Sequence, residues 1–537
     1  MLKKFLLCAT AGFAMSAHAL DGEIQIHDPS TIARDGSRFY TYGTGNGIPI
    51  LSSDDGWTWR RSGSLMSAVP GGKAGPEVLA KGGNNTWAPD VIHIGDKYFV
   101  YYSAPGTQPK SAIGLLIGKT LDPESPDYKW EDGGPVVWSD GIEDSNAIDP
   151  GVLLDPDGRL WLVYGSYFGY IRLVELDPKT GQRKFPDRKP VNVAINSEAA
   201  ILIHRDGWYY LLVTHGSCCQ GANSTYNIRM GRSRKVTGPY LDNMGIDMID
   251  GGGKLFAGSR GRHVGPGHFG LLDLGDGVEK FSLHYEADLD RGGISVLDIR
   301  PLLWRDGWPV AGDNLVAGPY SIESARTGTV LELAVQGTPV GGFRMRRGGP
   351  PGSGIVGGGP PGAGGPPGAG GPPGAGAPPG TGAPPAGAGA PPAGPPPLPS
   401  AGPPIPDQEP AHVAAWPATT GVRLAPAMLQ AQQKWTIAPV AGAGGYPGAP
   451  YFRITIANTE RALTATAGGE LAATPYTGAP EQLWRIDQLT DGRYRLNPKS
   501  IPGTSEPLFL SAVGSSMPTL QKFDPASDRQ RWSLGAP

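Results

Sequence analysis

The chain has 537 residues, of which 18% are charged, and a formal net charge of −3. This length exceeds what one ordinary hydrophobic core occupies, so we expect more than one domain. The nearly balanced charge excludes a bulk basic field of the kind that attracts nucleic acid or an acidic membrane surface. It favours a neutral or weakly charged partner.

The first 19 residues have the pattern of a secretory signal peptide. Two lysines precede a short apolar run, and Ala17, His18 and Ala19 form a small-residue cleavage site. Cys8 lies inside the apolar run without a small residue directly before it, which disfavours a lipoprotein. Elsewhere no stretch is long and apolar enough for a transmembrane helix. We therefore expect a secreted or periplasmic protein with no membrane partner, whose mature chain begins near Leu20.

Five segments share one layout, in which a short motif is followed by an apolar strand, a Gly/Asp turn and an aromatic-rich strand. They read HDPSTIARDGSRFYTYGTG, WAPDVIHIGDKYFVYYSA, IDPGVLLDPDGRLWLVYGS, SEAAILIHRDGWYYLLVTHG and GHFGLLDLGDGVEKFSLHY. Each predicts a β-hairpin. Starts roughly 50 to 70 residues apart leave room for four strands each, as in the blades of a propeller. We expect an all-β protein with a five-bladed β-propeller over residues 20–317.

One position recurs in all five segments when residues are counted back from the turn. It holds Asp28, Ala88, Asp149, Glu198 and His268. The first strand of each propeller blade lines the central axis, so equivalent positions are expected to form a ring at one mouth of the channel. Any one of these carboxylates alone is more often a turn residue. Three together repel one another and raise the pKa of at least one, which favours a chemical role.

Two carboxyl groups with different pKa values are what glycoside hydrolysis requires. Glu198 precedes an apolar run and is the candidate acid, Asp28 is the candidate base, and Asp149 is the candidate residue that tunes the acid. The competing chemical interpretation is metal binding by the same carboxylates together with His268. Without a DxDxDG loop, this set is a weak calcium signal.

Further residues lie near the same predicted mouth. Trp87 precedes the ring position of the second blade, where it either stacks on a sugar or packs in the core, and both interpretations stay open. Asn146, Ser166 and Phe168 are candidates to complete a polar cleft. Asp90 lies deeper on the same face, so we expect it to be a buried structural hydrogen-bond acceptor.

The motifs HDPS, WAPD, NAIDPGV, SEAA and GPGH, together with SCCQGANSTYNIRMGRS and GGISVLDIRPLLW, resemble the arabinanases of glycoside hydrolase family 43. The resemblance covers roughly residues 22–318 and the motifs follow the family's order. It implies a five-bladed propeller and inverting hydrolysis of α-1,5-linked L-arabinofuranose chains. It places the general base on Asp28, the pKa modulator on Asp149 and the general acid on Glu198, in agreement with the ring.

The same resemblance implies the residues that bind substrate and an ion. Substrate contacts fall on Asp28, on residues 146–149 and on residues 166–168. A further contact would fall on Gly106, but here the loop YYSAPGTQPKSAIG is shorter than the family's. The resemblance also implies one calcium ion in the channel, held by His268 and water molecules.

Together these features predict an endo-acting enzyme whose partner is plant cell-wall arabinan or arabino-oligosaccharides. Three alternatives remain open from the residues. They are an exo-acting α-L-arabinofuranosidase, a β-xylosidase on the same scaffold, and a carbohydrate-binding protein without activity. The presence of all three carboxylates disfavours the last.

After removal of the signal peptide only two cysteines remain, Cys218 and Cys219. Adjacent cysteines cannot join distant segments, so the fold needs no disulfide framework. The pair forms either a vicinal disulfide or two free thiols, and the sequence does not distinguish these states.

The C-terminal part predicts a second domain, over residues 318–537. Three Gln-x-Trp motifs, ending at Trp435, Trp484 and Trp532, resemble those of a ricin-type β-trefoil. A Gly/Pro/Ala block predicts a disordered insertion over residues 346–410. The start of the first repeat, GPYSIESARTGTVLELAVQG, precedes this block, so the insertion is expected inside that repeat. A second sugar bound by the trefoil is a hypothesis, because no repeat shows a clear sugar-binding Asp.

Overall fold

The computed structural model describes residues 20–107, 109–142, 145–334, 418–514 and 517–537. The predicted signal peptide and the predicted disordered insertion lie outside these residues. Apart from the helix α1 (Pro76–Lys81) and short 3-10 turns, the regular elements in the described residues are β-strands. The prediction of an all-β protein is therefore confirmed.

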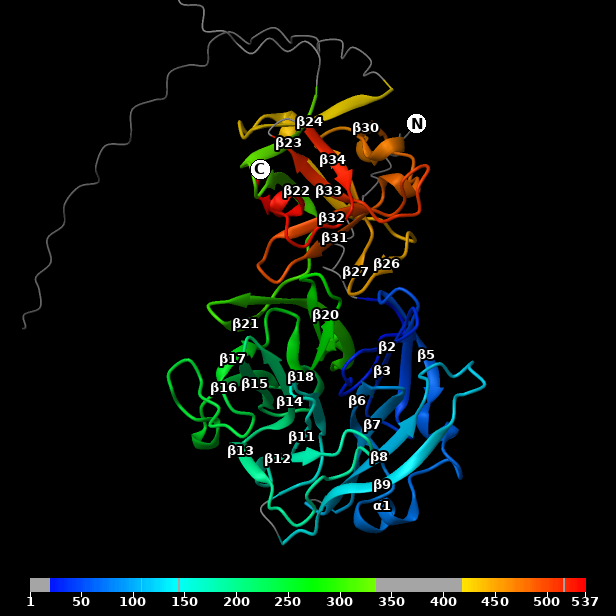
Figure 1. The fold of residues 1–537 in the computed structure, drawn as a ribbon, viewed down its shortest axis with the longest axis vertical. Helices are drawn as coiled ribbons and strands as arrows, with labels where there is room; N and C mark the ends of the chain where they lie inside the picture. Colours follow the sequence, from blue (N-terminus) through cyan, green and yellow to red (C-terminus); the bar gives the residue numbers. More distant parts are fainter. Residues whose placement is uncertain (1–19, 108, 143–144, 335–417, 515–516) are drawn as a thin grey trace, which may run out of the picture. The chain divides into compact units, whose positions relative to one another are not determined.

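The first domain contains five sheets, each with four antiparallel strands in sequence order, and the sheet of blade one carries β1 (Asp21–Gly22) as a fifth strand (Figure 1). Blade one contains β2 (Ala33–Asp35), β3 (Arg38–Tyr42), β4 (Pro49–Ser53) and β5 (Thr58–Ser64). Blade two contains β6 (Trp87–Ile94), β7 (Lys97–Pro105), β8 (Ser111–Gly118) and β9 (Trp130–Ser139). Blade three contains β10 (Gly151–Leu154), β11 (Leu160–Tyr164), β12 (Tyr170–Leu176) and β13 (Val191–Ile195).

Blade four contains β14 (Glu198–Arg205), β15 (Trp208–His215), β16 (Asn227–Ser233) and β17 (Lys254–Ala257). Blade five contains β18 (Val264–Asp273), β19 (Glu279–Ala287), β20 (Ile294–Arg305) and β21 (Trp308–Ala311). The first two strands of each blade form the predicted hairpins. The five-bladed propeller predicted from the repeats is confirmed.

Each pair of neighbouring blades shares one apolar core, which explains the aromatic-rich second strands. In β7, Tyr98, Val100 and Tyr102 face the core between blades one and two. The alternate residues Phe99 and Tyr101 face the core between blades two and three. Because side chains alternate across a strand, a strand buried on both faces needs a continuous apolar run. Five such cores hold the blades in a ring.

The N-terminal segment closes this ring between blades one and five. The strand β1 (Asp21–Gly22) pairs with β5 in parallel. The Ile26 amide donates to the Ser295 carbonyl at 3.1 Å, and the Leu297 amide donates to the Ile24 carbonyl at 2.9 Å. This segment leads directly into His27 and Asp28, so closure of the ring also places the predicted base.

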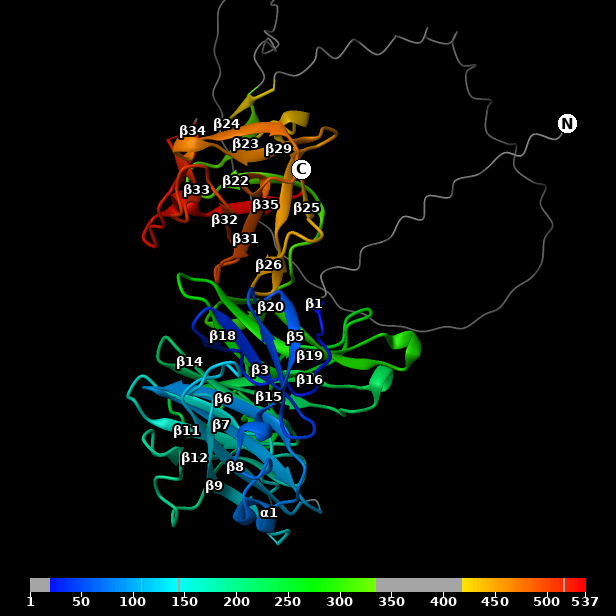
Figure 2. The same ribbon diagram turned by 90° about the vertical axis from the view of Figure 1, so that its right-hand side faces the viewer.

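The second domain is a β-trefoil built around a closed six-stranded barrel (Figure 2). The barrel strands are β22 (Gly318–Ser324), β25 (Trp435–Pro439), β28 (Phe452–Ile456), β31 (Trp484–Gln488), β32 (Tyr494–Pro498) and β35 (Trp532–Gly535), and each pairs with the next around the ring. Three hairpins accompany the barrel. They are β23 (Thr329–Leu333) with β24 (Thr420–Pro426), β29 (Arg461–Ala465) with β30 (Leu471–Pro475), and β33 (Phe509–Val513) with β34 (Met517–Gln521).

The three Gln-x-Trp motifs occupy equivalent places in the trefoil. Trp435, Trp484 and Trp532 are fully buried in one core. Their indole nitrogens donate to the carbonyls of Leu331, Leu463 and Leu510 at 2.8, 2.9 and 2.9 Å. Each indole therefore fastens its barrel strand to the hairpin of its own repeat. In the first repeat, the paired strands β23 and β24 lie on either side of residues 335–417, so this segment separates two strands of one repeat.

Candidate active site

Five residues with left-handed backbone form a ring at one mouth of the propeller, one from each blade. They are Asp28, Ala88, Asp149, Ala199 and His268, with φ values of 48°, 38°, 56°, 47° and 62°. Such φ values are uncommon outside glycine and concentrate at functional positions. The ring is therefore a shared local structure of the five blades.

Each ring amide donates a hydrogen bond to a side chain of the preceding blade. The acceptors are Thr44 for Ala88 at 2.8 Å, Ser103 for Asp149 at 2.9 Å, Asp149 for Ala199 at 3.2 Å, Thr214 for His268 at 3.1 Å and His284 for Asp28 at 3.1 Å. These bonds pass around the mouth from blade to blade. They satisfy the amides left free by the left-handed turns and fix the position of the side chains that the ring presents.

The structure corrects the predicted alignment in blade four by one residue. The left-handed residue there is Ala199, and Glu198 pairs with Thr214 just as Trp87 pairs with Ser103 in blade two. Glu198 is thus equivalent to Trp87, and the prediction that it shares the position of Asp28 and Asp149 is wrong. The same register shift follows Trp87 in blade two, so in both blades the left-handed residue comes directly after the residue that opens the β-bulge.

Asp28 is surrounded by imidazole rings. Its carboxylate lies 3.5 Å from His27 Nε2, 3.4 Å from His268 Nδ1 and 3.8 Å from His284 Nδ1. The Thr44 hydroxyl donates to Asp28 Oδ2 at 2.6 Å. Burial alone would raise the pKa of Asp28, but the charge of His27 and the hydrogen bond and charge of His268 lower this pKa well below its usual range. Asp28 is therefore ionised at neutral pH.

The pKa values of the two neighbouring histidines are shifted in opposite directions. Burial lowers the pKa of His284 to about 3, so this ring is neutral, and its Nδ1 accepts from the Asp28 amide. For His268, burial alone would lower the pKa, but the hydrogen bond and charge of Asp28 raise it above the ordinary value. His268 thus holds a proton more readily than a free imidazole does, beside the ionised Asp28.

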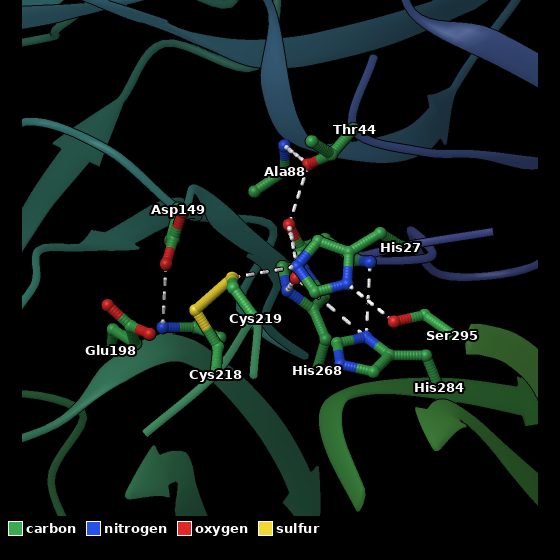
Figure 3. A network of polar contacts seen from close by, with 12 residues as sticks. His27, Thr44, Ala88, Asp149, Glu198, Cys218, Cys219, His268, His284 and Ser295 are labelled. Atoms are coloured by element: carbon green, nitrogen blue, oxygen red, sulfur yellow. Dashed lines mark hydrogen bonds and ion pairs between the residues drawn. A yellow bond between two sulfur atoms is a disulfide. The ribbon is translucent and has the colours of Figure 1, made fainter. Parts of the chain in front are cut away.

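Asp149 and Glu198 lie on the other side of the mouth in less polar surroundings (Figure 3). Burial raises the pKa of Asp149 well above its usual value, and the charges of Glu198 and Asp28 raise it further. Burial also raises the pKa of Glu198, although the hydroxyl of Tyr226, which donates to Glu198 Oε1, opposes this rise. The mouth therefore holds one ionised carboxylate opposite two that retain protons more readily.

The structure brings some of the predicted substrate contacts together. Asn146 is fully buried, its Oδ1 accepts from Ser111 Oγ at 2.7 Å, and its Nδ2 donates to Ser166 Oγ at 3.4 Å. Ser166 in turn hydrogen-bonds Glu198. Phe168 is 53% exposed and Trp87 is half-buried, so each retains a free surface.

Two further residues fall outside this group. Gly106 follows β7, and its amide donates to the Lys110 carbonyl at 2.9 Å. The described contacts do not join it to the three carboxylates. Asp90 accepts from the Thr31 amide at 3.0 Å and from the Val152 amide at 2.9 Å, so it links three blades. Its predicted role as a buried structural acceptor is confirmed.

Four contacts of the site were not predicted from the sequence. Thr44 and His284 hold Asp28, Tyr226 holds Glu198, and Cys219 Sγ lies 3.5 Å from His27 Nε2. Thr44, Thr214 and Ser103 all lie at or just beyond the end of a blade's second strand. This recurrence of a small hydroxyl residue is the signal from which the ring of amide acceptors could have been found.

His268 is the residue predicted to hold an ion. Its Nδ1 is buried and faces Asp28 Oδ1. Among the described residues, two groups of side chains offer three metal-ligand atoms close together, and neither group includes His268. Calcium prefers six to eight oxygen ligands. The side chains around His268 therefore do not form a protein cage for calcium.

A propeller mouth that holds an ionised Asp opposite a carboxyl group with a raised pKa has the equipment of a glycoside hydrolase. Residues 23–309 match the family model described as glycosyl hydrolases family 43. The chain belongs to this family and is a glycoside hydrolase. Residues 431–502 match the model described as ricin-type beta-trefoil lectin domain-like.

Curated relatives match the propeller half of the chain. The extracellular exo-alpha-(1->5)-L-arabinofuranosidase ArbA of Cellvibrio japonicus is 36% identical over 324 residues, which are 57% of this chain and 89% of that protein. The extracellular endo-alpha-(1->5)-L-arabinanase 1 of Bacillus subtilis is 34% identical over 295 residues, which are 53% of this chain and 87% of that protein.

A solved structure also matches the propeller half of the chain. The structure of Cellvibrio cellulosa alpha-L-arabinanase complexed with arabinohexaose is 33% identical, with a TM-score of 0.50, and the match covers 54% of this chain and 95% of that chain. In the part of the chain that the structure describes, no helix has the length and apolar character needed to cross a membrane.

Proposed function

We propose that the protein hydrolyses α-1,5-L-arabinofuranosidic bonds of arabinan with inversion of configuration. The observation that supports this most strongly is the opposite shift of the pKa values of Asp28 and Glu198 within one mouth. The relatives named for arabinan or α-(1→5)-arabinofuranoside hydrolysis support the choice of substrate.

In the proposed reaction, Asp28 takes a proton from water, and the water oxygen bonds to the anomeric carbon from the face opposite the leaving group. Glu198 gives its proton to the glycosidic oxygen as the bond from this oxygen to the anomeric carbon breaks. Asp149 keeps the pKa of Glu198 raised and positions the Ala199 amide beside it. One bond forms, one bond breaks, and the configuration changes from α to β.

Endo action on the arabinan backbone is our proposal for the mode of attack, and exo action is the second candidate. Each is supported by one relative, since the Bacillus subtilis protein is named an endo-arabinanase and the Cellvibrio japonicus protein an exo-arabinofuranosidase. Product analysis on debranched arabinan separates them. Endo action gives a broad range of early oligomers and a rapid fall in viscosity, whereas release of only one short product would overturn the endo proposal.

The stereochemistry is tested in the same reaction. Proton NMR during the first minutes is expected to show the β-anomer of the new reducing end before mutarotation. Initial formation of the α-anomer would contradict the roles proposed for Asp28 and Glu198.

We also propose that the enzyme is secreted and that its trefoil binds a sugar. The relatives from Cellvibrio japonicus and Bacillus subtilis are both named extracellular, and the trefoil matches a lectin-like model. Mature enzyme in the culture medium is expected to begin near Leu20. For the trefoil, titration calorimetry with the Glu198→Gln full-length enzyme compares arabinan, galactan and simple sugars. Absence of heat beyond one propeller site per chain would refute the trefoil proposal.

A calcium ion in the channel, held by His268 and water, is the remaining proposal. It draws on the place of His268 in the ring alone, because the surrounding side chains do not form a cage. No step of the proposed reaction passes through this ion.

A further inference from the structure

A pair of sulfur atoms lies at the mouth beside the proposed base. Cys218 and Cys219 form a vicinal disulfide in the loop between β15 and β16. Cys218 is half-buried and Cys219 is exposed, so solvent reaches the pair. Cys219 Sγ lies 3.5 Å from His27 Nε2. In the view of Figure 3, the disulfide lies between Glu198 and His27.

His27 presents one specific nitrogen to these sulfurs. Its Nδ1 lies 3.0 Å from Ser295 Oγ, and Ser295 Oγ donates to Glu286 Oε1 at 3.0 Å. Because the hydroxyl donates its one proton to Glu286, it accepts from His27 Nδ1–H, and Nε2 is the nitrogen that a metal ion can bind. Metal-ligating histidines commonly have this arrangement, in which the second nitrogen donates to an outer group that fixes the ring.

The backbone fixes the position of the cysteine loop independently of the disulfide. The Ala222 amide donates to the Gly292 carbonyl at 2.7 Å, and the Thr225 amide donates to the Ser217 carbonyl at 3.0 Å. Gly221 packs so closely on blade five that an added Cβ would lie 1.9 Å from the Gly292 carbonyl oxygen. Opening the sulfur bond therefore leaves the loop beside His27.

The three donor atoms lie close enough together to serve one soft-metal ion once the disulfide is open. The two Sγ atoms and the His27 nitrogen lie within 4.8 Å of one another. Tetrahedral Zn²⁺, with bonds of about 2.3 Å to sulfur and about 2.0 Å to nitrogen, places its donors roughly 3.5 to 3.8 Å apart. Opening the disulfide lets the two sulfurs separate to that spacing, which the proposed site requires.

We propose that Cys218, Cys219 and His27 form a Zn²⁺ site that is closed by the disulfide and opened by reduction. A phosphine reductant donates the electron pair that breaks the sulfur–sulfur bond and becomes a phosphine oxide with an oxygen from water. The two protons of that water pass to the two sulfurs. Zn²⁺ then displaces both thiol protons into solvent and accepts the His27 Nε2 lone pair.

Occupation of this site inhibits hydrolysis, a consequence that rests on the proposed role of Asp28. His27 Nε2 lies 3.5 Å from Asp28 Oδ2. A cation on Nε2 is adjacent to this carboxylate and takes Asp28 as its fourth ligand. A carboxylate bound to Zn²⁺ cannot accept a proton from water, so the enzyme stops until the metal is removed.

The experiment measures metal uptake and activity separately. Full-length enzyme is reduced with a phosphine, desalted without oxygen and mixed with Cd²⁺ or Zn²⁺. We expect one tightly held ion per chain and, with Cd²⁺, an ultraviolet thiolate charge-transfer band. The unreduced enzyme and the Cys218→Ser/Cys219→Ser variant receive the same treatment. Both are expected to lack the band and the additional ion, which also corrects for any ion elsewhere in the channel.

Activity on debranched arabinan is expected to fall at least tenfold when Zn²⁺ binds to the reduced enzyme, and to recover with EDTA. The serine variant is compared with its own metal-free rate and is expected to change less than twofold. Equal metal uptake by the reduced enzyme and the serine variant would overturn the site, as would no uptake by the reduced enzyme. Uptake without inhibition would preserve the site and instead contradict Asp28 as the base.

Discussion

Asp28 lies among three imidazole rings and a threonine hydroxyl, whereas Glu198 has one tyrosine hydroxyl and mostly uncharged, buried surroundings. Burial raises the pKa of both groups, so burial cannot separate them. The separation comes from the cationic neighbours of Asp28. The comparison shows that residues from blades one and five keep the base ionised, while residues from blades three and four favour protonation of the acid.

The most severe test replaces each carboxyl group by its amide. We expect both Asp28→Asn and Glu198→Gln to lower kcat/KM on arabinan by about 10³-fold, since each removes a proton transfer. An aryl arabino-oligosaccharide with a good leaving group distinguishes the two sides. It needs little acid assistance, so Glu198→Gln is expected to regain activity on it and Asp28→Asn is not.

Glu175→Gln, on the half-buried carboxylate that pairs with Lys184 at 2.6 Å, serves as the control and should keep its activity. Recovery by the Asp28 variant instead of the Glu198 variant would show that Asp28 is the acid and Glu198 the base. Full activity of either variant on arabinan would contradict the proposed mechanism.

The second test removes the carboxyl group that neighbours the acid. Asp149→Asn is expected to lower kcat about 10- to 100-fold and to shift the alkaline limb of the kcat/KM profile to lower pH. The sign follows from the repulsion between the two carboxylates, because Asp149 and Glu198 together lose their last proton at a higher pH than Glu198 would on its own. The pH profile is measured with arabino-oligosaccharides. A shift of this limb to higher pH would contradict the role of Asp149.

Much of the fold could be predicted because each repeat carries its own hairpin signal, and each Gln-x-Trp motif marks one trefoil repeat. The position of Asp28 followed from the same repeats. Its neighbour His284 did not, because this histidine contacts Asp28 through folded-state proximity rather than through a shared motif. The one-residue error at Glu198 arose because this carboxylate lies directly before the left-handed residue Ala199, whereas Asp28 and Asp149 are themselves left-handed, and the residue types do not reveal which residue has that backbone.

A third test removes one hydroxyl group that contacts the proposed acid. Tyr226 donates to Glu198 Oε1 and lowers the pKa of that carboxyl group, so Tyr226→Phe is expected to raise it. The alkaline limb of kcat/KM should move to higher pH by about one unit, the scale of a hydrogen bond to a charged group. Tyr209→Phe, whose hydroxyl bonds Asp155 at 3.3 Å, is the matched control. An unchanged limb would show that Tyr226 does not act on the proton of the acid.

The corresponding change on the base side is Thr44→Val. Its hydroxyl stabilises ionised Asp28, so the pKa of Asp28 rises and the acidic limb moves to higher pH by about one unit. Because that pKa starts far below neutrality, the rate at pH 7 should change less than after Tyr226→Phe. The variant also leaves the Ala88 amide without its acceptor, at a cost of about 1 to 3 kcal/mol in the free energy of unfolding. Thr44→Ser is the control, because its hydroxyl restores the hydrogen bonds to Asp28 and to the Ala88 amide. If the pH profile of Thr44→Val is identical to that of the parent enzyme, the hydroxyl does not act on Asp28.

The smallest expected effect is that of calcium removal. His268 is both the proposed ligand and a neighbour of Asp28, and a ring nitrogen cannot hold a proton and a metal ion together. Since Asp28 raises the pKa of His268, protons compete with the ion for this ring as pH falls. EDTA is therefore expected to lower kcat/KM by no more than about threefold at neutral pH, because calcium binds weakly where oxygen ligands are few. The effect should decrease toward acidic pH, where the imidazolium supplies the positive charge. Complete loss of activity with EDTA, restored by Ca²⁺, would show that the ion rather than the proton on His268 keeps Asp28 ionised.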